Sequence, residues 1–142
     1  MRHETGLPTE DEWRIIFDSW AKSWMKSPWS GTIRNCDWDE MSRKASQELV
    51  DRPTTRVVVA YGFTEAGVRR VKGYIVYEPT RRIIHWLYTK RDFRGQGVAR
   101  QLLAAATEST ERSTWIYTHR TNACSRLLRG MKHDKSYACT KG

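Results

Sequence analysis

The segment YTKRDFRGQGVARQLL, residues 88–103, decides how the rest of the sequence is interpreted. It begins at the end of an apolar run, turns through Gly95 and Gly97, and then repeats apolar residues at the spacing of one helix face. This order predicts a strand, a glycine loop and a helix. The first N–H groups of such a helix have no internal partner, and the helix dipole makes that end positive. The segment is therefore suited to bind the phosphates of a ligand.

The side chains around the two glycines also favour an anionic ligand. A glycine has no Cβ, so the backbone can approach phosphate closely. Four basic residues surround the turn, namely Lys90, Arg91, Arg94 and Arg100. The pattern is not a Walker loop, because no Gly-Lys-Ser/Thr follows, and it is not the GxGxxG dinucleotide fingerprint. A purely structural strand-to-helix turn also uses glycine, and this alternative stays open.

The remaining sequence predicts helices and strands in one mixed fold. A first helix starts near Thr9, with Glu12 placed for a capping box, and ends before Pro28. A second helix is expected from about Asp37 to Val50. Strands are predicted at 56–61, 71–78, 83–89 and 113–118, with a short helix at 122–128 and an edge strand at 136–139. The first three strands fit an antiparallel meander, whereas the strand, loop, helix and strand unit requires a parallel crossover.

The charge of the chain is unevenly distributed. Its 142 residues carry a formal net charge of +9. Residues 1–80 hold 12 basic and 12 acidic residues, whereas residues 81–142 hold 13 basic and 4 acidic ones. A basic half indicates an anionic partner, such as a polyphosphate cofactor or nucleic acid, or else only a solvated surface. With no internal repeat or linker, residues 1–142 are treated as a single domain.

Composition also bears on location. No stretch reaches the roughly 20 apolar residues that a membrane span needs, and the first residues lack the apolar run of a signal peptide. The cysteines at 36, 124 and 139 form no CxxC pair, which argues against a disulfide framework and against a metal site. We therefore expect a cytoplasmic protein that needs no metal.

The sequence resembles the GNAT superfamily of acyl-coenzyme A N-acyltransferases. Arg94-x-x-Gly97-x-Ala99 matches the acyl-CoA loop of that superfamily, written Q/R-x-x-G-x-G/A. Residues 2–7 are the candidate for its first strand, and the strand IHWLYTK is similar to small acetyltransferase-like proteins of bacteriophages. The resemblance implies a GNAT fold of the α+β class. Its central sheet is mostly antiparallel, with a parallel splayed strand pair and flanking helices.

The resemblance also implies how acetyl-CoA, or another acyl-CoA, is held. The pantetheine arm inserts between the splayed strands, where backbone groups of Leu87 and Thr89 bind it and an N–H near Leu87 polarises the thioester. An amine then attacks directly, and coenzyme A leaves. The cofactor-binding residues implied in this way are Leu87, Tyr88, Thr89, Arg94, Gly95, Gln96, Gly97, Val98, Ala99, Arg100 and Asn122.

Direct attack requires a base. An alkyl ammonium has a pKa near 10.4, and an imidazole with a pKa near 6.5 can accept its proton. His85 is the candidate, because no glutamate occurs from 81 to 90, and it stands nine residues before Arg94, as a base-forming histidine does in arylalkylamine acetyltransferases. On regular alternation its side chain shares a face with Ile83 and Leu87. A half-buried structural histidine is the alternative.

A general acid for the departing thiolate is less evident. The superfamily often has a tyrosine about four residues before a Gly-Phe pair. Here residues 130–131 stand for that pair, and Arg126 occupies the tyrosine position. Tyr117, Tyr137 and Ser125 are the candidate substitutes, although ordinary packing explains a tyrosine equally well. The thiolate can also leave into water.

Aromatic residues near the N-terminus have two expected roles. The helical stripe of Trp13, Phe17, Trp20 and Trp24 is expected in the core. Trp29 differs because it lies in a loop with proline and glycine, and it is a candidate to stack on a substrate ring.

The leading functional hypothesis is transfer of an acyl group, in particular acetyl, from acyl-CoA to an amine. One alternative is a phage-type GNAT-like enzyme that modifies nucleic-acid bases, which the basic half suits. Another is a non-catalytic GNAT fold that binds nucleic acid or a host protein. The missing tyrosine supports that last alternative, whereas the intact glycine loop argues against it.

Overall fold

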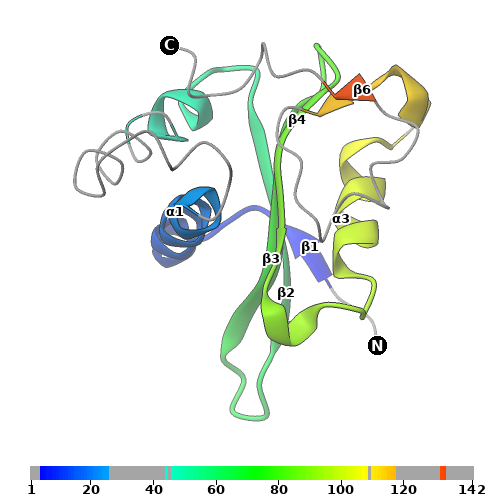
Figure 1. Cartoon of the computed structure of the whole chain (residues 1–142). Coiled ribbons are helices and arrows are strands. Elements are labelled where there is room, and N and C mark those ends of the chain that lie inside the picture. The colour runs from blue at the N-terminus through cyan, green and yellow to red at the C-terminus, as the bar shows by residue number, and fades with distance from the viewer. Residues whose placement is uncertain (1–3, 26–43, 45, 109, 118–131, 134–142) are drawn as a thin grey trace.

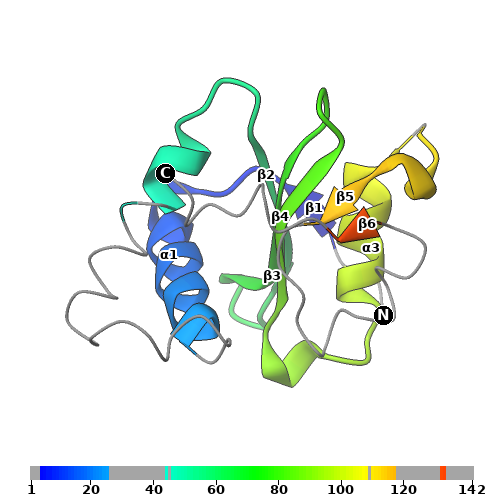
Figure 2. The same cartoon turned by 45° about the horizontal axis from the view of Figure 1, so that its top comes forward.

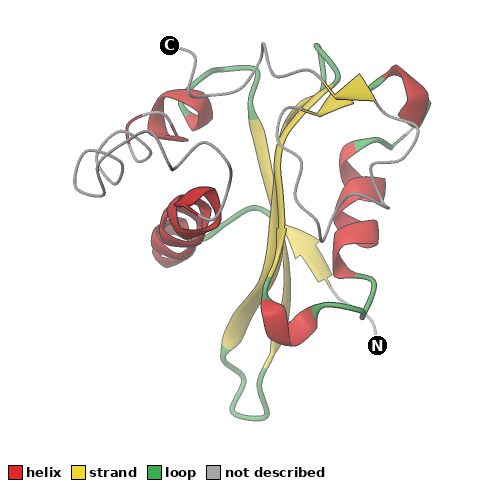
Figure 3. Cartoon of the chain, in the orientation of Figure 1, coloured by secondary structure: helices red, strands yellow, loops and turns green. Residues whose placement is uncertain are grey.

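The computed structural model describes residues 4–25, 44, 46–108, 110–117 and 132–133. In this part of the chain the strands form a single six-stranded sheet in the sequence order β1-β2-β3-β4-β5-β6. Helices lie on both sides of the sheet (Figures 1 and 3). The strands are β1 Glu4–Gly6, β2 Arg56–Phe63, β3 Arg69–Glu78, β4 Ile83–Thr89, β5 Ile116–Tyr117 and β6 Lys132–His133.

Strand directions confirm the mixed sheet expected from the sequence. The pairs β1–β2, β2–β3 and β3–β4 are antiparallel. The pair β4–β5 is parallel, as the crossover through the glycine loop requires. The candidate first strand is confirmed by β1, which pairs its Glu4 with Tyr61. A second parallel pair, β5–β6, was not predicted.

Two helices cover opposite faces of the sheet (Figure 1). Helix α1, Glu10–Met25, lies on one face, and helix α3, Val98–Ala106, lies on the other. A shorter helical stretch, residues 46–50, packs on the α1 side, because its Leu49 is buried in the same cluster as Ile16 of α1. This stretch agrees with the C-terminal part of the second helix predicted from the sequence. Its earlier part, residues 37–43, lies outside the described residues.

The α1 side of the core is built around stacked tryptophans. Trp20 is fully buried, and its ring stacks on that of Trp86 in β4 with centroids 5.9 Å apart. Trp13 is partly buried against the same cluster, and Phe17 stacks on Trp13. The prediction that this stripe lies in the core is therefore confirmed at Trp20, whereas Trp13 is only partly buried. The side chain of Trp24 lies outside the described part.

The α3 side of the core follows from the apolar face of that helix. Four of its nine residues are buried: Val98, Leu102, Leu103 and Ala106. They pack against β2, β3 and β4 together with Trp115. This close fit needs a glycine in β3. A Cβ at Gly73 would lie 2.5 Å from the carbonyl oxygen of Tyr88 and 3.1 Å from a methyl of Val98. Gly73 thus allows the start of α3 to lie against the end of β4.

The strand predicted at 113–118 starts later than expected. Residues Arg112–Thr114 form a 3₁₀ turn, and among the described residues Ile116–Tyr117 pair with β4. The Thr114 hydroxyl donates to the Glu111 carbonyl at 2.6 Å, a local bond that competes with strand pairing. The last strand is found at Lys132–His133, and the segment predicted at 136–139 lies outside the described residues.

Candidate active site

Within the described residues, strands β4 and β5 are paired over two residues. Ile83 faces Ile116, and Ile84 faces Tyr117. β4 continues for five more residues, from 85 to 89, which remain paired with β3 on their other side except at His85. The C-terminal end of β4 leads directly into the glycine loop, so the two predicted parts of an acyl-CoA site are continuous (Figure 2).

The glycine loop has a backbone that side-chain-bearing residues rarely adopt. Gly95 and Gly97 have φ values of +80° and +82°, in the left-handed region. A Cβ at either position would meet no atom within 4 Å, so the space above both glycines is open. The Gly97 carbonyl accepts from the N–H of Gln101 at 3.0 Å, which makes Gly97 the first residue of the helical ladder. The N–H groups that follow it are those of a helix N-terminus.

Packing fixes the loop at both ends. On one side Val98 is buried in the α3 core, and on the other Phe93 packs against the same core. The ammonium of Lys72 lies 5.4 Å from the centre of the Phe93 ring. The Arg94 Nε donates to the Thr89 carbonyl at 3.2 Å. Residues 94–97 are exposed between these anchors, so the loop combines a fixed frame with an accessible backbone.

His85 lies in a bulge of β4. Val76 of β3 faces Trp86, and the next residue, Tyr77, faces Ile84, so His85 is the extra residue between them. The bulge breaks the alternation expected from the sequence. Leu87 packs on the α3 side with Ile84, whereas His85 turns to Glu78. The prediction that His85 shares a face with Leu87 was therefore wrong.

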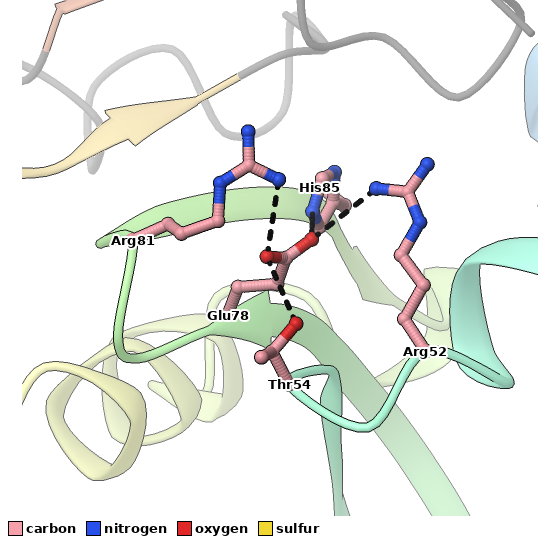
Figure 4. Close-up of polar contacts among 5 residues, drawn as sticks. All are labelled: Arg52, Thr54, Glu78, Arg81 and His85. Atoms are coloured by element: carbon pink, nitrogen blue, oxygen red, sulfur yellow. Dashed lines mark hydrogen bonds and ion pairs between the residues drawn. The ribbon is translucent and has the colours of Figure 1, made fainter.

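Glu78, at the end of β3, forms a buried pair with His85. The Nε2 atom of His85 lies 2.9 Å from Oε1 of Glu78, and the side chains are 1% and 0% exposed. Figure 4 shows three further groups around this carboxylate. The Arg52 Nη1 lies 3.4 Å from Oε1, the Thr54 hydroxyl donates to Oε2 at 3.2 Å, and the Arg81 Nη1 lies 3.3 Å from Oε2.

These surroundings set the charge of the pair. Burial alone raises the pKa of Glu78, but the hydrogen bond and charge of His85, the charge of Arg81 and the Thr54 hydroxyl together lower that pKa below its usual value. Burial lowers the pKa of His85, and the two arginines add to this, against the opposing effect of Glu78. At neutral pH the pair is thus a carboxylate and a neutral imidazole. Since Nε2–H then donates to Glu78, the lone pair of the ring belongs to Nδ1.

The sequence profile of the acetyltransferase (GNAT) domain matches residues 53–130. The chain belongs to the GNAT family. This family as a whole transfers an acetyl group and uses acetyl-CoA as cosubstrate. The matched range includes both β4 and the glycine loop. No curated protein matches the chain.

Two solved structures have the same GNAT fold. A protein from Pyrococcus furiosus, provisionally described as an acetyl transferase, superposes with a TM-score of 0.58 at 14% identity over 85% of each chain. A protein from Staphylococcus aureus, provisionally described as a GNAT family acetyltransferase, has a TM-score of 0.52 at 11% identity over 94% of this chain and 98% of the other. At these identities the likeness shows the fold alone.

Several predicted site residues of this GNAT chain come together along β4. Leu87 is buried, and Tyr88 and Thr89 are partly exposed at the strand end that leads into the loop. Val98, Ala99 and Arg100 form the first turn of α3. Tyr117 is 8% exposed and packs in the α3 core. Four candidates lie outside the described residues, namely Trp29, Asn122, Ser125 and Tyr137.

Glu78 and its partners were not predicted from the sequence. The family resemblance directed attention to glutamates on β4, whereas the buried glutamate beside His85 comes from the neighbouring strand β3. A signal was present, because Glu78 is the only acidic residue in the strand RRVKGYIVYE and ends an apolar run. A buried acid in that position needs partners. The bulge that brings His85 to it has no sequence signature.

The described residues contain neither a metal-binding cluster nor a membrane-spanning helix. No group of three or more histidine, cysteine, aspartate or glutamate side chains is placed to hold a metal ion. Among the helices in that part of the chain, none is long and apolar enough to cross a membrane.

Proposed function

We propose that this GNAT protein is an acyl-CoA-dependent N-acyltransferase that transfers acetyl to an amine. One observation carries the proposal: beyond its described pairing with β5, strand β4 leads directly into a loop whose two glycines have open space above them. The resemblance to the family places the pantetheine arm along β4, and a pyrophosphate needs such a loop. Residues 94–100 are the proposed pyrophosphate site, and backbone groups of Leu87 and Thr89 the proposed pantetheine partners.

The reaction forms one bond and breaks another. The amine nitrogen attacks the thioester carbonyl carbon, the C–N bond forms, and the C–S bond breaks with its electron pair on sulfur. The proposed acceptor of the proton lost by the amine is Nδ1 of His85, reached through water because the side chain is only 1% exposed. Glu78 supports this step in two ways, because it holds the Nε2–H tautomer and stabilises the positive charge that the ring gains.

The source of a proton for the thiolate is part of the same proposal. Tyr117 is a candidate by its place on β5, although its burial in the α3 core also suits a packing role. Tyr137 and Ser125 are candidates from the sequence alone. Departure of the thiolate into water requires none of them. Trp29 is the proposed stacking residue for an acceptor with a ring.

A second candidate is an enzyme of the phage type that acts on nucleic-acid bases in the cytoplasm of its host. The observation that favours it is the charge of residues 81–142, whose described arginines at 81, 82, 91, 94 and 100 are exposed. Binding to DNA should then weaken steeply as salt increases. Absence of any DNA retention in gel shifts at low salt would remove both this candidate and the non-catalytic nucleic-acid binder.

The experiment that tests the main proposal compares two glycines with the same backbone. Gly97→Asp places a carboxylate against the proposed pyrophosphate site. Gly67→Asp is the matched control, because Gly67 has φ +79°, has open space above it, and lies in the β2–β3 hairpin. Calorimetry should show acetyl-CoA binding to the wild type and to Gly67→Asp, and severely weakened binding to Gly97→Asp. Equal affinity in the two variants contradicts the proposed site.

A further inference from the structure

Strand β3 carries a buried lysine at a bulge. Ala60 of β2 faces Gly73 of β3, and the next residue, Tyr61, faces Val71, so Lys72 is the extra residue between them. Lys72 is only 8% exposed. Lysine is rarely buried to this extent, because its ammonium loses hydration. Its burial therefore directs attention to the groups that it contacts.

The side chain of Lys72 lies between β2 and the turn that precedes the glycine loop. A Cβ at Gly62 would lie 2.9 Å from Cε and 3.0 Å from Nζ of Lys72, so the lysine fills the space that this glycine leaves. The Nζ atom lies over the Phe93 ring, 5.4 Å from its centre. The face of an aromatic ring attracts a cation at this distance. Phe93 ends the 3₁₀ turn Arg91–Phe93 and packs against the α3 core.

The backbone of the same lysine holds the other end of this turn. The Lys72 carbonyl accepts from the N–H of Lys90 at 2.8 Å, one residue after the end of β4. The Lys90 carbonyl in turn accepts from the N–H of Phe93 at 2.9 Å. Lys72 thus contacts the segment 90–93 at its first residue through the backbone and at its last residue through the side chain. Figure 1 shows this segment between the C-terminal end of β4 and the loop before α3.

The segment 90–93 determines how the glycine loop leaves the sheet. Arg94 follows it directly, and the two glycines come next, with positive φ and open space above them. Ordering a glycine-rich backbone on binding costs conformational entropy, so affinity for an anion increases when the flanking residues already fix the loop. Val98 fixes it from the α3 side. Lys72 contacts it from the β3 side, through Phe93.

We propose that Lys72 is a positioning residue for the pyrophosphate of acyl-CoA. It holds the segment 90–93, and thereby the glycine loop, in the conformation that binds the anion. The inference rests on the proposed acyl-CoA site and adds to it a residue from another strand. Lys72 needs no opening of its own, because the ligand binds at the accessible loop and the lysine acts through Phe93.

Substitutions at Lys72 test the contribution of the ammonium. Lys72→Met keeps an unbranched side chain and removes the charge, whereas Lys72→Arg keeps a cation that can stack on the Phe93 ring. Calorimetry should show acetyl-CoA binding to Lys72→Met roughly three- to tenfold more weakly than to the wild type, the loss expected for a cation over an aromatic face. Lys72→Arg should recover most of that loss. Arg70→Gln is the matched control for the loss of one positive charge, because Arg70 lies two residues away on β3 and is exposed. It should bind as the wild type does.

The location of the effect distinguishes positioning of the loop from general damage. NMR of the free protein should show altered backbone amide signals for Gly95 and Gly97 in Lys72→Met, whereas the signal of Gly67 in the β2–β3 hairpin stays unchanged. The loss of affinity should likewise appear for ADP, which carries the diphosphate. It should not appear for pantetheine, whose proposed partners are backbone groups of β4.

A substitution on β2 provides an independent test. Gly62→Ala places a methyl where the end of the Lys72 side chain lies, so that end must move from its position over Phe93. Acetyl-CoA binding should weaken in the same direction, while the free energy of unfolding stays close to that of the wild type. In the double variant with Lys72→Met the two losses should not add, because the ammonium is already absent.

Three results overturn the inference. The first is equal acetyl-CoA affinity in the wild type and Lys72→Met, and the second is a loss that Arg70→Gln reproduces. The third is an equal loss for ADP and pantetheine with all three glycine signals altered, which would make Lys72 a residue of general stability. If the wild type itself does not bind acetyl-CoA, the proposed function fails. The amide signals of Gly95 and Gly97 then still report whether Lys72 fixes the loop.

Discussion

The two ends of β4 are built in opposite ways. At its C-terminal end the glycine loop is exposed, depends on backbone conformation and consists of consecutive residues. Towards its N-terminal end, the Glu78–His85 pair is buried and combines side chains from β3, β4 and the segment before β2. The loop is suited to a group that every GNAT reaction shares. The buried pair depends on tertiary contacts, and it lies at the end of β4 where we propose that the acceptor amine is deprotonated.

The largest expected effect is a loss of turnover without a loss of acetyl-CoA affinity, which would distinguish the two ends of β4. His85→Ala removes the proposed proton acceptor, so turnover should fall by roughly 10²–10⁴-fold. Acetyl-CoA affinity should stay near the wild-type value, because the glycine loop is untouched. Steady-state rates with an accepted amine, together with calorimetry, measure both quantities. Wild-type turnover between pH 6 and 8 would mean that His85 is structural and that the base lies elsewhere.

A smaller effect is expected where the loop is fixed to the sheet. Gly73→Ala forces a Cβ towards the Tyr88 carbonyl and Val98, at distances that require the start of α3 to move. We expect a loss of about 1–3 kcal/mol in the free energy of unfolding and weaker acetyl-CoA binding.

Gly62→Ala is the control for this change. Its Cβ meets only the far end of the Lys72 side chain, at 2.9 Å, and that end can move aside. Denaturant unfolding of both variants measures the difference. Similar stability in the two would show that the contact between β3, β4 and α3 is looser than these distances indicate.

The smallest effect is the contribution of the buried pair to stability at different pH values. The pKa of His85 is lowered on folding, so the unfolded chain binds a proton first as pH falls below about 6.5, and stability decreases. The lowered pKa of Glu78 adds a second loss below its ordinary value of 4.5. Thermal unfolding from pH 8 to well below pH 4.5 should show both steps.

His85→Gln should remove the step near pH 6.5, whereas Gly97→Asp should leave it in place. Such a result would assign the step to the buried pair and not to the loop. An unchanged step in His85→Gln would place the titrating group elsewhere in the chain.

The two ends of β4 also differ in how much of each could be predicted from the sequence. The helix, the strands and the glycine loop were predictable, because each depends on residues adjacent in sequence. The role of Glu78 was not, since its partner His85 is seven residues away across a turn and reaches it only through a bulge. Regular alternation placed His85 on the wrong face for that reason. The acyl-CoA loop could thus be proposed from residues adjacent in sequence, whereas the proposed role of Glu78 beside His85 required the tertiary structure.

The bulge makes His85 a supernumerary residue of the sheet. Without it, Ile84 and Trp86 would be consecutive, and the pairing with Tyr77 and Val76 would continue as an uninterrupted ladder. Deletion of this single residue should therefore be tolerated by the scaffold, which would keep its two cores while losing the proposed proton acceptor. In this sense the imidazole is an insertion into the sheet that separates the two hydrophobic cores.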